Sequence, residues 1–324
     1  MEQVGQLQPV SLRISVTDRC QLRCAYCMPP QGVPLAPREE VLRFEEIAEF
    51  AGFVHRRLGL AKARITGGEP LVRAGLTVLV EQLVRLGIPD VALTTNGQRL
   101  AEMAADLRRA GLGRVNVSLD TLNPDTYRTL ACGGDLARTL AGIDAALKAG
   151  LVPVKLNMLV LRGVNDHEAG AVARFSLDRG LAVRFLELMP IGAATGHFEQ
   201  WFVPSSQVRR VLAESFRLRP LAAQAEGSSR DYLAEDAEGR SGTVGFISSC
   251  SEPFCRGCRR LRLTATGRLL GCLAQEKGFD VRGLLRGQRP LDEAGLAGTL
   301  QAALGLKQGV RRFADGRLMV RVGG

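Results

Sequence analysis

Three cysteines near the start of this 324-residue chain have the spacing of cluster ligands, because Cys20, Cys24 and Cys27 form a C-x3-C-x2-C motif. Three thiolates at this spacing can hold three irons of a cubane cluster, which normally takes four cysteine ligands. The fourth iron would then be open to a small molecule. A zinc site is the alternative, but structural zinc prefers CxxC pairs and a fourth protein ligand, and no histidine lies nearby.

A second group of cysteines lies late in the chain, where Cys255, Cys258 and Cys272 form a C-x2-C-x13-C pattern. Alone it could be half of a zinc ribbon, particularly if Cys250 supplies a fourth thiolate. Beside the first motif, we interpret it as the site of an auxiliary iron–sulfur cluster. If Cys250 is not a ligand, this cluster also has an open iron that could bind substrate. We interpret the isolated Cys132 as a bystander.

The elements that must position these cysteines follow a β–α rhythm. Short β-rich runs are expected at Leu12–Val16, Ala63–Thr66, Val91–Thr95, Val115–Leu119, Val152–Leu159 and Ala182–Leu188, with helical patterns near 42–58, 72–86, 99–110, 136–149 and 167–179. Gly111, Gly150 and Gly180 follow three of these helices, where C-cap glycines belong. Such alternation predicts parallel strands with right-handed crossovers. Six units are too few for a standard eight-unit barrel, so a partial barrel or an open doubly wound sheet is expected.

The rhythm ends after Met189, and short β pieces surround the late cysteines. We therefore predict an α/β fold: a partial (βα)6 TIM-like barrel with a smaller C-terminal auxiliary-cluster domain. Residues 1–230 would form the barrel with the first cluster. Residues 231–324 would carry the second cluster, helices near 280–286 and 292–304, and a basic β-prone tail that ends in two glycines.

Composition limits the partners. The formal charge is +10, which favours an anionic ligand, but the single Trp and three Tyr offer few stacking platforms. We therefore expect a polyphosphate ligand and no nucleic acid. The chain has no export signal and no run of eighteen apolar residues, which predicts a cytoplasmic protein without membrane contact. Eight cysteines in such a protein indicate thiolate ligands or redox work and not disulfides.

Several motifs together resemble a known superfamily. Tyr26 precedes the third cysteine, and the run Gly67-Gly68-Glu69-Pro70 ends the second expected strand, as in radical S-adenosylmethionine (SAM) enzymes. Glycines without a Cβ let the backbone approach a ligand closely. The late run Cys255-Arg-Gly-Cys258-Arg-Arg260-Leu-Arg262 and the terminal Gly323-Gly324 narrow the resemblance to the GTP 3′,8-cyclase family of molybdenum cofactor biosynthesis.

This resemblance implies two 4Fe–4S clusters, SAM and a reaction. SAM binds the open iron and yields a 5′-deoxyadenosyl radical, which removes hydrogen from the ribose 3′ carbon of GTP, and the new radical attacks guanine carbon 8. It also implies an electron donor protein and a downstream cyclic pyranopterin monophosphate synthase, and it leaves room for a homodimer. Alternatives are another radical SAM enzyme with an auxiliary cluster, such as a peptide-modifying one, or remotely a zinc-binding, nucleic-acid-associated protein.

The resemblance also assigns binding residues. The implied SAM contacts are Tyr26, Gly68, Ser118 and Met189, and the implied GTP contacts are Arg13, Arg64, Thr95, Lys155, Arg260 and Arg262, with Lys62 and Arg184 as weaker candidates. Arg and Lys suit a triphosphate because they stay charged and donate several hydrogen bonds. The tail glycines Gly323 and Gly324 would reach back to the active site. Cys250 and Arg259 depart from the family pattern, and Cys250 as a ligand would exclude substrate binding to an open iron.

Overall fold

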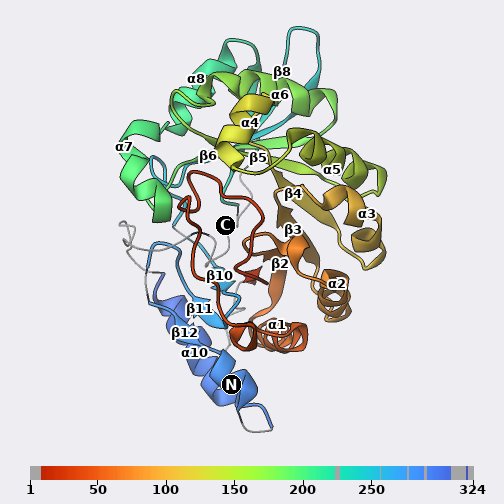
Figure 1. Ribbon diagram of the computed structural model, residues 1–324, viewed down its shortest axis with the longest axis vertical. Helices are drawn as coiled ribbons and strands as arrows, with labels where there is room; N and C mark the ends of the chain where they lie inside the picture. The colour runs from red at the N-terminus through yellow and green to blue at the C-terminus, as the bar shows by residue number, and fades with distance from the viewer. Residues whose placement is uncertain are drawn as a thin grey trace.

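The computed structural model describes residues 9–222, 227–255, 257–275, 277–287, 290–307 and 319. Its centre is a sheet in which β1 to β6 lie side by side in sequence order, each parallel to the next (Figure 1). These strands are β1 Val10–Ser15, β2 Leu60–Thr66, β3 Asp90–Thr95, β4 Arg114–Ser118, β5 Lys155–Val160 and β6 Ala182–Glu187. The prediction of six parallel βα units is therefore confirmed.

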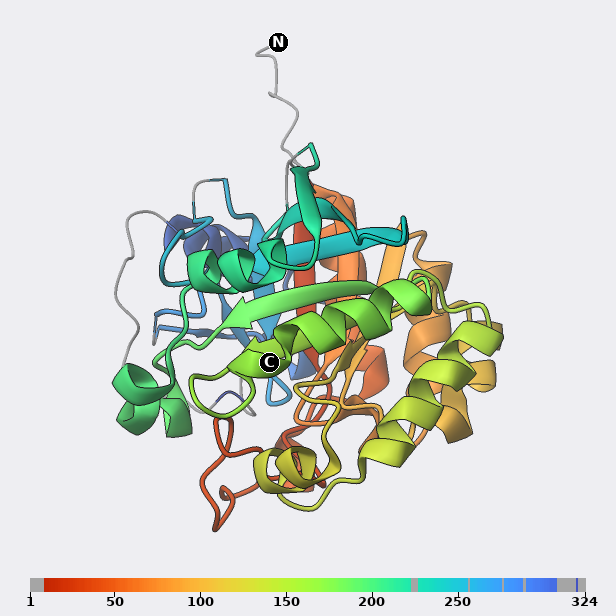
Figure 2. The same ribbon diagram turned by 90° about the horizontal axis from the view of Figure 1, so that it is seen from above.

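Helices cover the outer face of this sheet (Figures 1 and 2). The five predicted helices are α1 Phe44–Leu58, α2 Leu76–Arg85, α3 Leu100–Arg109, α5 Leu136–Lys148 and α6 Ala169–Asp178. Gly111, Gly150 and Gly180 follow α3, α5 and α6 with φ values of 94°, 75° and 65°. This left-handed conformation is the one that glycine adopts after a helix end, so the C-cap prediction is confirmed.

Some elements differ from the prediction. Three helices that we did not predict are α4 Pro124–Ala131, α7 Phe198–Trp201 and α8 Ser205–Ala213. The fifth strand begins at Lys155 and not at Val152, because Pro153 has no N–H to donate to a neighbouring strand.

The later part of the chain extends both edges of the sheet. On the β6 edge lie β9 Ser241–Ile247, β8 Arg230–Glu235 and β7 Arg217–Pro220, and on the β1 edge lie β10 Arg260–Leu263, β11 Arg268–Leu270 and β12 Phe279–Asp280. The helices α9 Arg282–Arg286 and α10 Glu293–Gly305 follow. The domain boundary near residue 230 stays a prediction, and the double-glycine tail lies outside the described residues.

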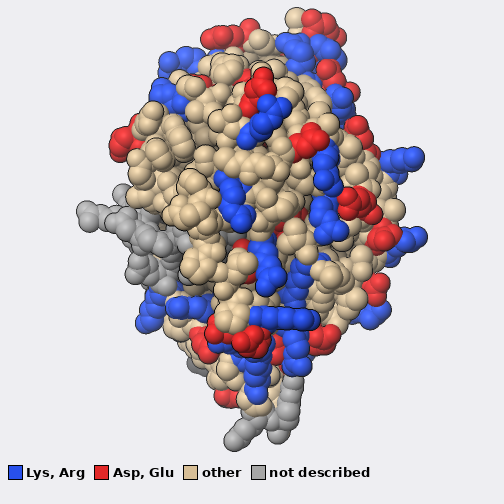
Figure 3. Space-filling model, viewed as in Figure 1, with Lys and Arg blue, Asp and Glu red and all other residues tan. Residues whose placement is uncertain are grey.

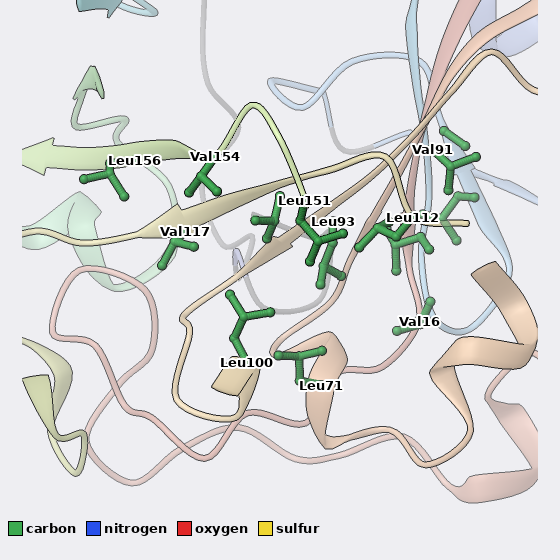
Figure 4. Packing of buried hydrophobic residues seen from close by; sticks show 14 of the residues in the cluster. Val16, Leu71, Val91, Leu93, Leu100, Leu112, Val117, Leu151, Val154 and Leu156 are labelled. Atoms are coloured by element: carbon green, nitrogen blue, oxygen red, sulfur yellow. The ribbon is translucent and has the colours of Figure 1, made fainter. Parts of the chain in front are cut away.

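The hydrophobic core fills the space between strands and helices. Figure 4 shows Leu93, Val117 and Leu156 from three adjacent strands in one cluster with Leu100 of α3, and all four are fully buried. Side chains alternate between the two faces of a strand, so the residues between these apolar positions face the opposite, inner side. In the described residues no helix is long and apolar enough to cross a membrane.

Candidate functional site

The first three cysteines lie in the loop that follows β1, drawn in red at the front of Figure 1. A tight turn forms there, because the N–H groups of Cys27 and Met28 both donate to the Cys24 carbonyl, at 2.8 and 3.1 Å. Burial raises the pKa of the Cys24 thiol, and Cys27, Asp120 and Cys20 raise it further. The structure therefore brings the three predicted thiols within electrostatic reach of one another.

The helix α4, absent from the sequence prediction, holds this loop in place. Arg23 N–H donates to the carbonyl of Ala131 and Ala25 N–H to that of Leu130, both at 3.0 Å. No three His, Cys, Asp or Glu side chains in the described part of the chain converge on a single metal position. A cubane cluster binds each thiolate through a different iron, so its ligands need not converge on one point. None of the three cysteines forms a disulfide, so their thiols fit such a cluster.

The glycine-rich motif packs directly on the start of the cysteine loop. A Cβ on Gly67 would lie 2.8 Å from the Thr17 carbonyl oxygen, and Gly68 N–H donates to that same oxygen at 2.7 Å. Glu69 is 1% exposed and accepts hydrogen bonds from Thr95 Oγ1 at 2.7 Å and from Asn96 N–H at 2.8 Å. Burial raises the pKa of Glu69 to about 7, although the hydrogen bonds from Thr95 and Asn96 act to lower it. At Gly67, the short distance to the Thr17 carbonyl oxygen leaves no room for a Cβ, so glycine is required there for close backbone packing.

Asn96 connects this motif to the first cysteine. Its Nδ2 lies 3.8 Å from Cys20 Sγ, while its N–H is held by Glu69. Sequence reasoning missed the organising role of both Glu69 and Asn96. The signal was present in the sequence, because Asn96 directly follows the third predicted strand, where parallel sheets place ligand-binding residues.

Tyr26 is fixed by a hydrogen bond to the Asp120 carboxylate. Its hydroxyl donates to Asp120 Oδ2 at 2.6 Å, and Asp120 Oδ1 accepts from the Leu159 N–H at 2.8 Å. Burial raises the pKa of Asp120 to about 6, whereas these two hydrogen bonds favour its charged form. The side-chain amide of Asn165 also donates hydrogen bonds to the backbone carbonyls of Asp120 and Leu159. The cysteine loop is thereby tied to the ends of β4 and β5.

Replacing Tyr26 by phenylalanine should therefore destabilise the protein. The change removes a hydrogen bond to a carboxylate, which is worth about 1.5–3 kcal/mol, and the free energy of unfolding should fall by that amount. Denaturant unfolding of the cluster-free chain under reducing conditions measures it. Tyr232→Phe is the matched control, because the Tyr232 ring packs edge-on against Phe246 on the far edge of the sheet. Equal losses in both variants would contradict the importance of the Asp120 contact.

The residues predicted to contact SAM all lie at the carboxyl ends of strands. Gly68 follows β2, Ser118 ends β4, Met189 follows β6, and Tyr26 is in the loop after β1. The carboxyl ends of parallel strands are where α/β barrels build their active sites. The structure thus brings the four residues to the same end of the barrel as the first cysteines.

The predicted GTP contacts include cations on neighbouring strands. Arg13 pairs in register with Arg262 of β10 on one side and with Arg64 of β2 on the other. Burial lowers the pKa of Arg13, and Arg262, Arg64 and Arg260 lower it further. Burial and neighbouring arginines also lower the pKa of Arg64 to about 9. These positive groups face one another, which is unfavourable unless an anion lies between them.

Lys155 extends this cluster across the barrel. Burial, Arg184 and Arg114 lower the pKa of Lys155 to about 8, and Asp231 offsets part of the shift. Several buried polar atoms around these cations have no hydrogen-bond partner among the described residues: Arg64 Nε, Arg114 Nη1, Asn116 Oδ1, Asn157 Oδ1, Ser229 Oγ and Asp231 Oδ1. Buried polar atoms are nearly always satisfied, so these unpaired groups indicate a polar ligand.

Sequence reasoning missed Arg114, Asn116 and Asn157. A period of two along each strand could have found them, because Arg114 and Asn116 alternate with buried valines before Ser118, and Asn157 follows Lys155 at the same spacing. These side chains share the inner face with residues that we did predict.

Lys62 and Thr95, both predicted GTP contacts, interact with other residues of the protein. Lys62 Nζ lies 3.4 Å from Asp90, which also pairs with Arg114 at 2.7 Å. Thr95 is 2% exposed, and its hydroxyl donates to Glu69 and accepts from Gly97 N–H at 3.0 Å. Thr95 therefore lies against the glycine-rich motif, and its GTP contact stays a prediction.

The second cysteine group follows β9 and surrounds β10. Cys258 N–H donates to the Cys255 carbonyl at 3.2 Å. Burial raises the pKa of the Cys258 thiol, but Arg260 and Lys307 outweigh burial and leave that pKa below its ordinary value. Cys272 also acts on Lys307, so it lies on the same side. A thiolate-favouring environment fits metal ligands.

Cys250 and Cys132 have different surroundings. Cys250 Sγ donates to the Leu188 carbonyl at 3.3 Å, and its N–H donates to Glu187 at 2.9 Å. Burial, with Glu187 nearby, raises the pKa of Cys250 to about 12, which disfavours a thiolate. Cys132 is exposed at the end of α4 and donates to the Thr129 carbonyl. Whether Cys250 binds the second cluster stays a prediction.

Comparison with known families matches both parts of the chain. Residues 14–176 match the Radical SAM superfamily, and residues 181–312 match the family described as Molybdenum Cofactor Synthesis C. The chain is 44% identical over 333 residues to the GTP 3′,8-cyclase of Pelotomaculum thermopropionicum, with 100% of each chain covered. It is 42% identical over 330 residues to that of Moorella thermoacetica, again with 100% of each chain covered.

Solved structures share the fold at low sequence identity. Streptococcus suis SuiB bound to S-adenosylmethionine matches with a TM-score of 0.60 and 15% identity, covering 90% of this chain and 68% of SuiB. SuiB bound to the precursor peptide SuiA matches with a TM-score of 0.61 and 13% identity, covering 97% and 72%. These matches support the partial barrel.

Proposed function

The chain belongs to the radical SAM superfamily and, within it, to the family of GTP 3′,8-cyclases, and we propose that it cyclises GTP in the first step of molybdenum cofactor biosynthesis. One observation carries the proposal: relatives with this activity match at 44% identity over the whole chain. The buried Arg64 Nε, which has no hydrogen-bond partner among the described residues, adds support, because a triphosphate oxygen can accept a hydrogen bond from it.

The cofactors of this family are two 4Fe–4S clusters and SAM. When bound, they supply the radical that removes hydrogen from the substrate. We assign the first cluster to Cys20, Cys24 and Cys27, and the second to Cys255, Cys258 and Cys272. Cys250 is less suited as a ligand, since its thiol bonds to a carbonyl and sits beside a carboxylate.

For GTP, we propose a division of labour inside the barrel. Arg13, Arg64 and Lys155, with Arg260 and Arg262 on β10, would bind the triphosphate. Asn116 and Asn157 present unpaired amide oxygens, which accept and cannot donate. They therefore suit the hydroxyl or amino donors of the nucleoside and not its phosphates. Arg114 would also contact the triphosphate, although its ion pair with Asp90 neutralises part of its charge.

The partners are proposals of the same kind. Arg19, Arg38 and Arg43 are exposed near the cysteine loop, and Figure 3 shows Lys and Arg side chains along the middle of this face. Such a surface suits an electron donor protein with an acidic surface. We also propose a cytoplasmic location, a downstream cyclic pyranopterin monophosphate synthase that consumes the product, and a homodimer as the assembly to test.

The decisive experiment is anaerobic incubation of the reconstituted chain with reductant, SAM and GTP, followed by mass analysis. We expect 5′-deoxyadenosine together with a GTP isomer of unchanged mass. A peptide in place of GTP should give no coupled product. Formation of 5′-deoxyadenosine without any GTP isomer would reject the cyclase activity, while leaving radical SAM chemistry intact.

GTP binding should weaken as the pH rises above about 8. Lys155 has a pKa of about 8 in the empty protein, so above this pH GTP meets a neutral amine. The affinity should fall by up to about tenfold per pH unit. This fall should end at the pH where Lys155 loses its proton even with GTP bound. Calorimetry between pH 7 and 10 measures the affinity. Lys155→Arg should remove this dependence below about pH 9, where Arg64 still keeps its proton, because a guanidinium at position 155 stays charged; an unchanged pH profile between pH 7 and 9 would contradict the role of Lys155.

The same shift gives the empty protein the opposite trend. The unfolded chain binds the Lys155 proton up to its ordinary pKa of 10.5, whereas the folded chain releases it at about 8. Between these values the unfolded state holds more protons, so Lys155 makes the fold more stable as the pH rises. Stability and GTP affinity should therefore change in opposite directions over this window.

A further inference from the structure

Lys307 lies at the second cysteine group although no motif points to it. Its ammonium is 3.7 Å from Cys258 Sγ and also donates to the Arg260 carbonyl. It is the second residue after α10, far in sequence from both partners. An ammonium has three donors, and these contacts use two of them.

Close packing of α10 brings Lys307 to this place. A Cβ on Gly271 would lie 1.8 Å from the Ala303 carbonyl oxygen, so only glycine lets the helix approach the residue before Cys272. Leu296, Leu300 and Ala303 bury the inner face of α10. The chain thus places a cation beside the thiols by a helix contact that tolerates no side chain at Gly271.

The positive charge of Lys307 is balanced by the second cysteine group. The Cys258 sulfur, 3.7 Å from the ammonium, is the group that can balance this charge, because the Arg260 carbonyl that the ammonium also contacts is neutral. Among the described residues, the polar contacts of the Lys307 ammonium are to the Cys258 sulfur and the Arg260 carbonyl, and neither is to an Asp or Glu. A half-buried ammonium needs an anionic partner, and thiolates that hold a cluster provide one.

We propose that Lys307 is a positioning residue of the second cluster, donating a hydrogen bond to the Cys258 sulfur and raising the reduction potential of the cluster. The inference rests on the proposed function in assigning that cluster to Cys255, Cys258 and Cys272. Hydrogen bonds to the sulfurs and nearby positive charge set cluster potentials. A cation stabilises the reduced cluster more, because reduction adds negative charge.

The test is a redox titration followed by electron paramagnetic resonance. It uses the full-length chain with Cys20, Cys24 and Cys27 replaced by alanine, so that only the second cluster contributes. At a fixed potential, Lys307→Met should lower the ratio of reduced to oxidised cluster about tenfold, which for one electron corresponds to about 59 mV. Lys307→Arg should keep most of the wild-type potential. Lys148→Met, at an exposed lysine on α5, is the matched control and should change nothing.

Each outcome decides between charge and packing. An unchanged potential in a fully loaded Lys307→Met variant overturns the proposal. Loss of the cluster in Lys307→Met but not in Lys307→Arg supports the charge role, whereas loss in both overturns it by showing a packing role. If the parent chain binds no second cluster at all, the cluster assignment in the proposed function fails, which is a distinct result.

Discussion

Replacing Cys24 by serine should abolish SAM cleavage and remove about four of the about eight irons in the reconstituted chain. Cys24 is the central thiol of the first loop, with Cys27 and Cys20 both within electrostatic reach. In this variant only Cys20 and Cys27 would remain to hold the cluster, and two thiolates would not fix its orientation. SAM would then lose the fixed position beside the cluster on which radical formation depends. Iron analysis and the yield of 5′-deoxyadenosine measure the two effects.

Cys132→Ser is the matched control for Cys24→Ser. Its thiol is exposed, donates to the Thr129 carbonyl and follows α4, the helix that also holds the cysteine loop. Iron content and SAM cleavage should therefore stay at wild-type levels in this variant. SAM cleavage at the wild-type rate in Cys24→Ser would reject the first cluster, and with it the radical mechanism.

The sequence carried enough information for the barrel because its signals are local. Each predicted strand is a short β-rich run and each predicted helix is amphipathic, and glycines with positive φ end three of the helices. The strands at the two edges of the sheet were harder to predict. β9 joins β6 and β10 joins β1 through pairings between residues that are far apart in the sequence, and no local pattern specifies which edge a strand will join.

The candidate site likewise contains parts with a local sequence signal and parts without one. Cysteine spacing and the glycine-rich motif are local, and both come together at the carboxyl ends of the strands as predicted. Asp120 directly follows the fourth predicted strand and so has the same positional signal as Asn96, but its partner Tyr26 lies in a distant segment and could not be predicted. Lys307 was not predictable, because a lone Lys after a helix has no sequence signal that distinguishes it from a surface charge.

The basic barrel implies a conflict between stability and binding, and Arg64→Met should expose it. Arg64 neighbours Arg13 in register, its Nε has no partner among the described residues, and burial with nearby arginines holds its pKa at about 9. Methionine keeps the unbranched stem and removes the charge. The empty variant should gain on the order of 1 kcal/mol in unfolding free energy. GTP affinity should fall about 10- to 100-fold, the value of one charge-assisted hydrogen bond.

Thermal melts and anaerobic calorimetry with GTP measure both sides of this conflict. Arg85→Met is the matched control, because Arg85 lies on the exposed face of α2 and pairs only weakly with Glu81 at the surface. It should change neither quantity. A loss of stability in Arg64→Met would show that another part of the protein satisfies Arg64, and unchanged affinity would place the triphosphate elsewhere. Opposite changes in the two quantities are expected only if the arginines are held against their mutual repulsion for an anionic ligand.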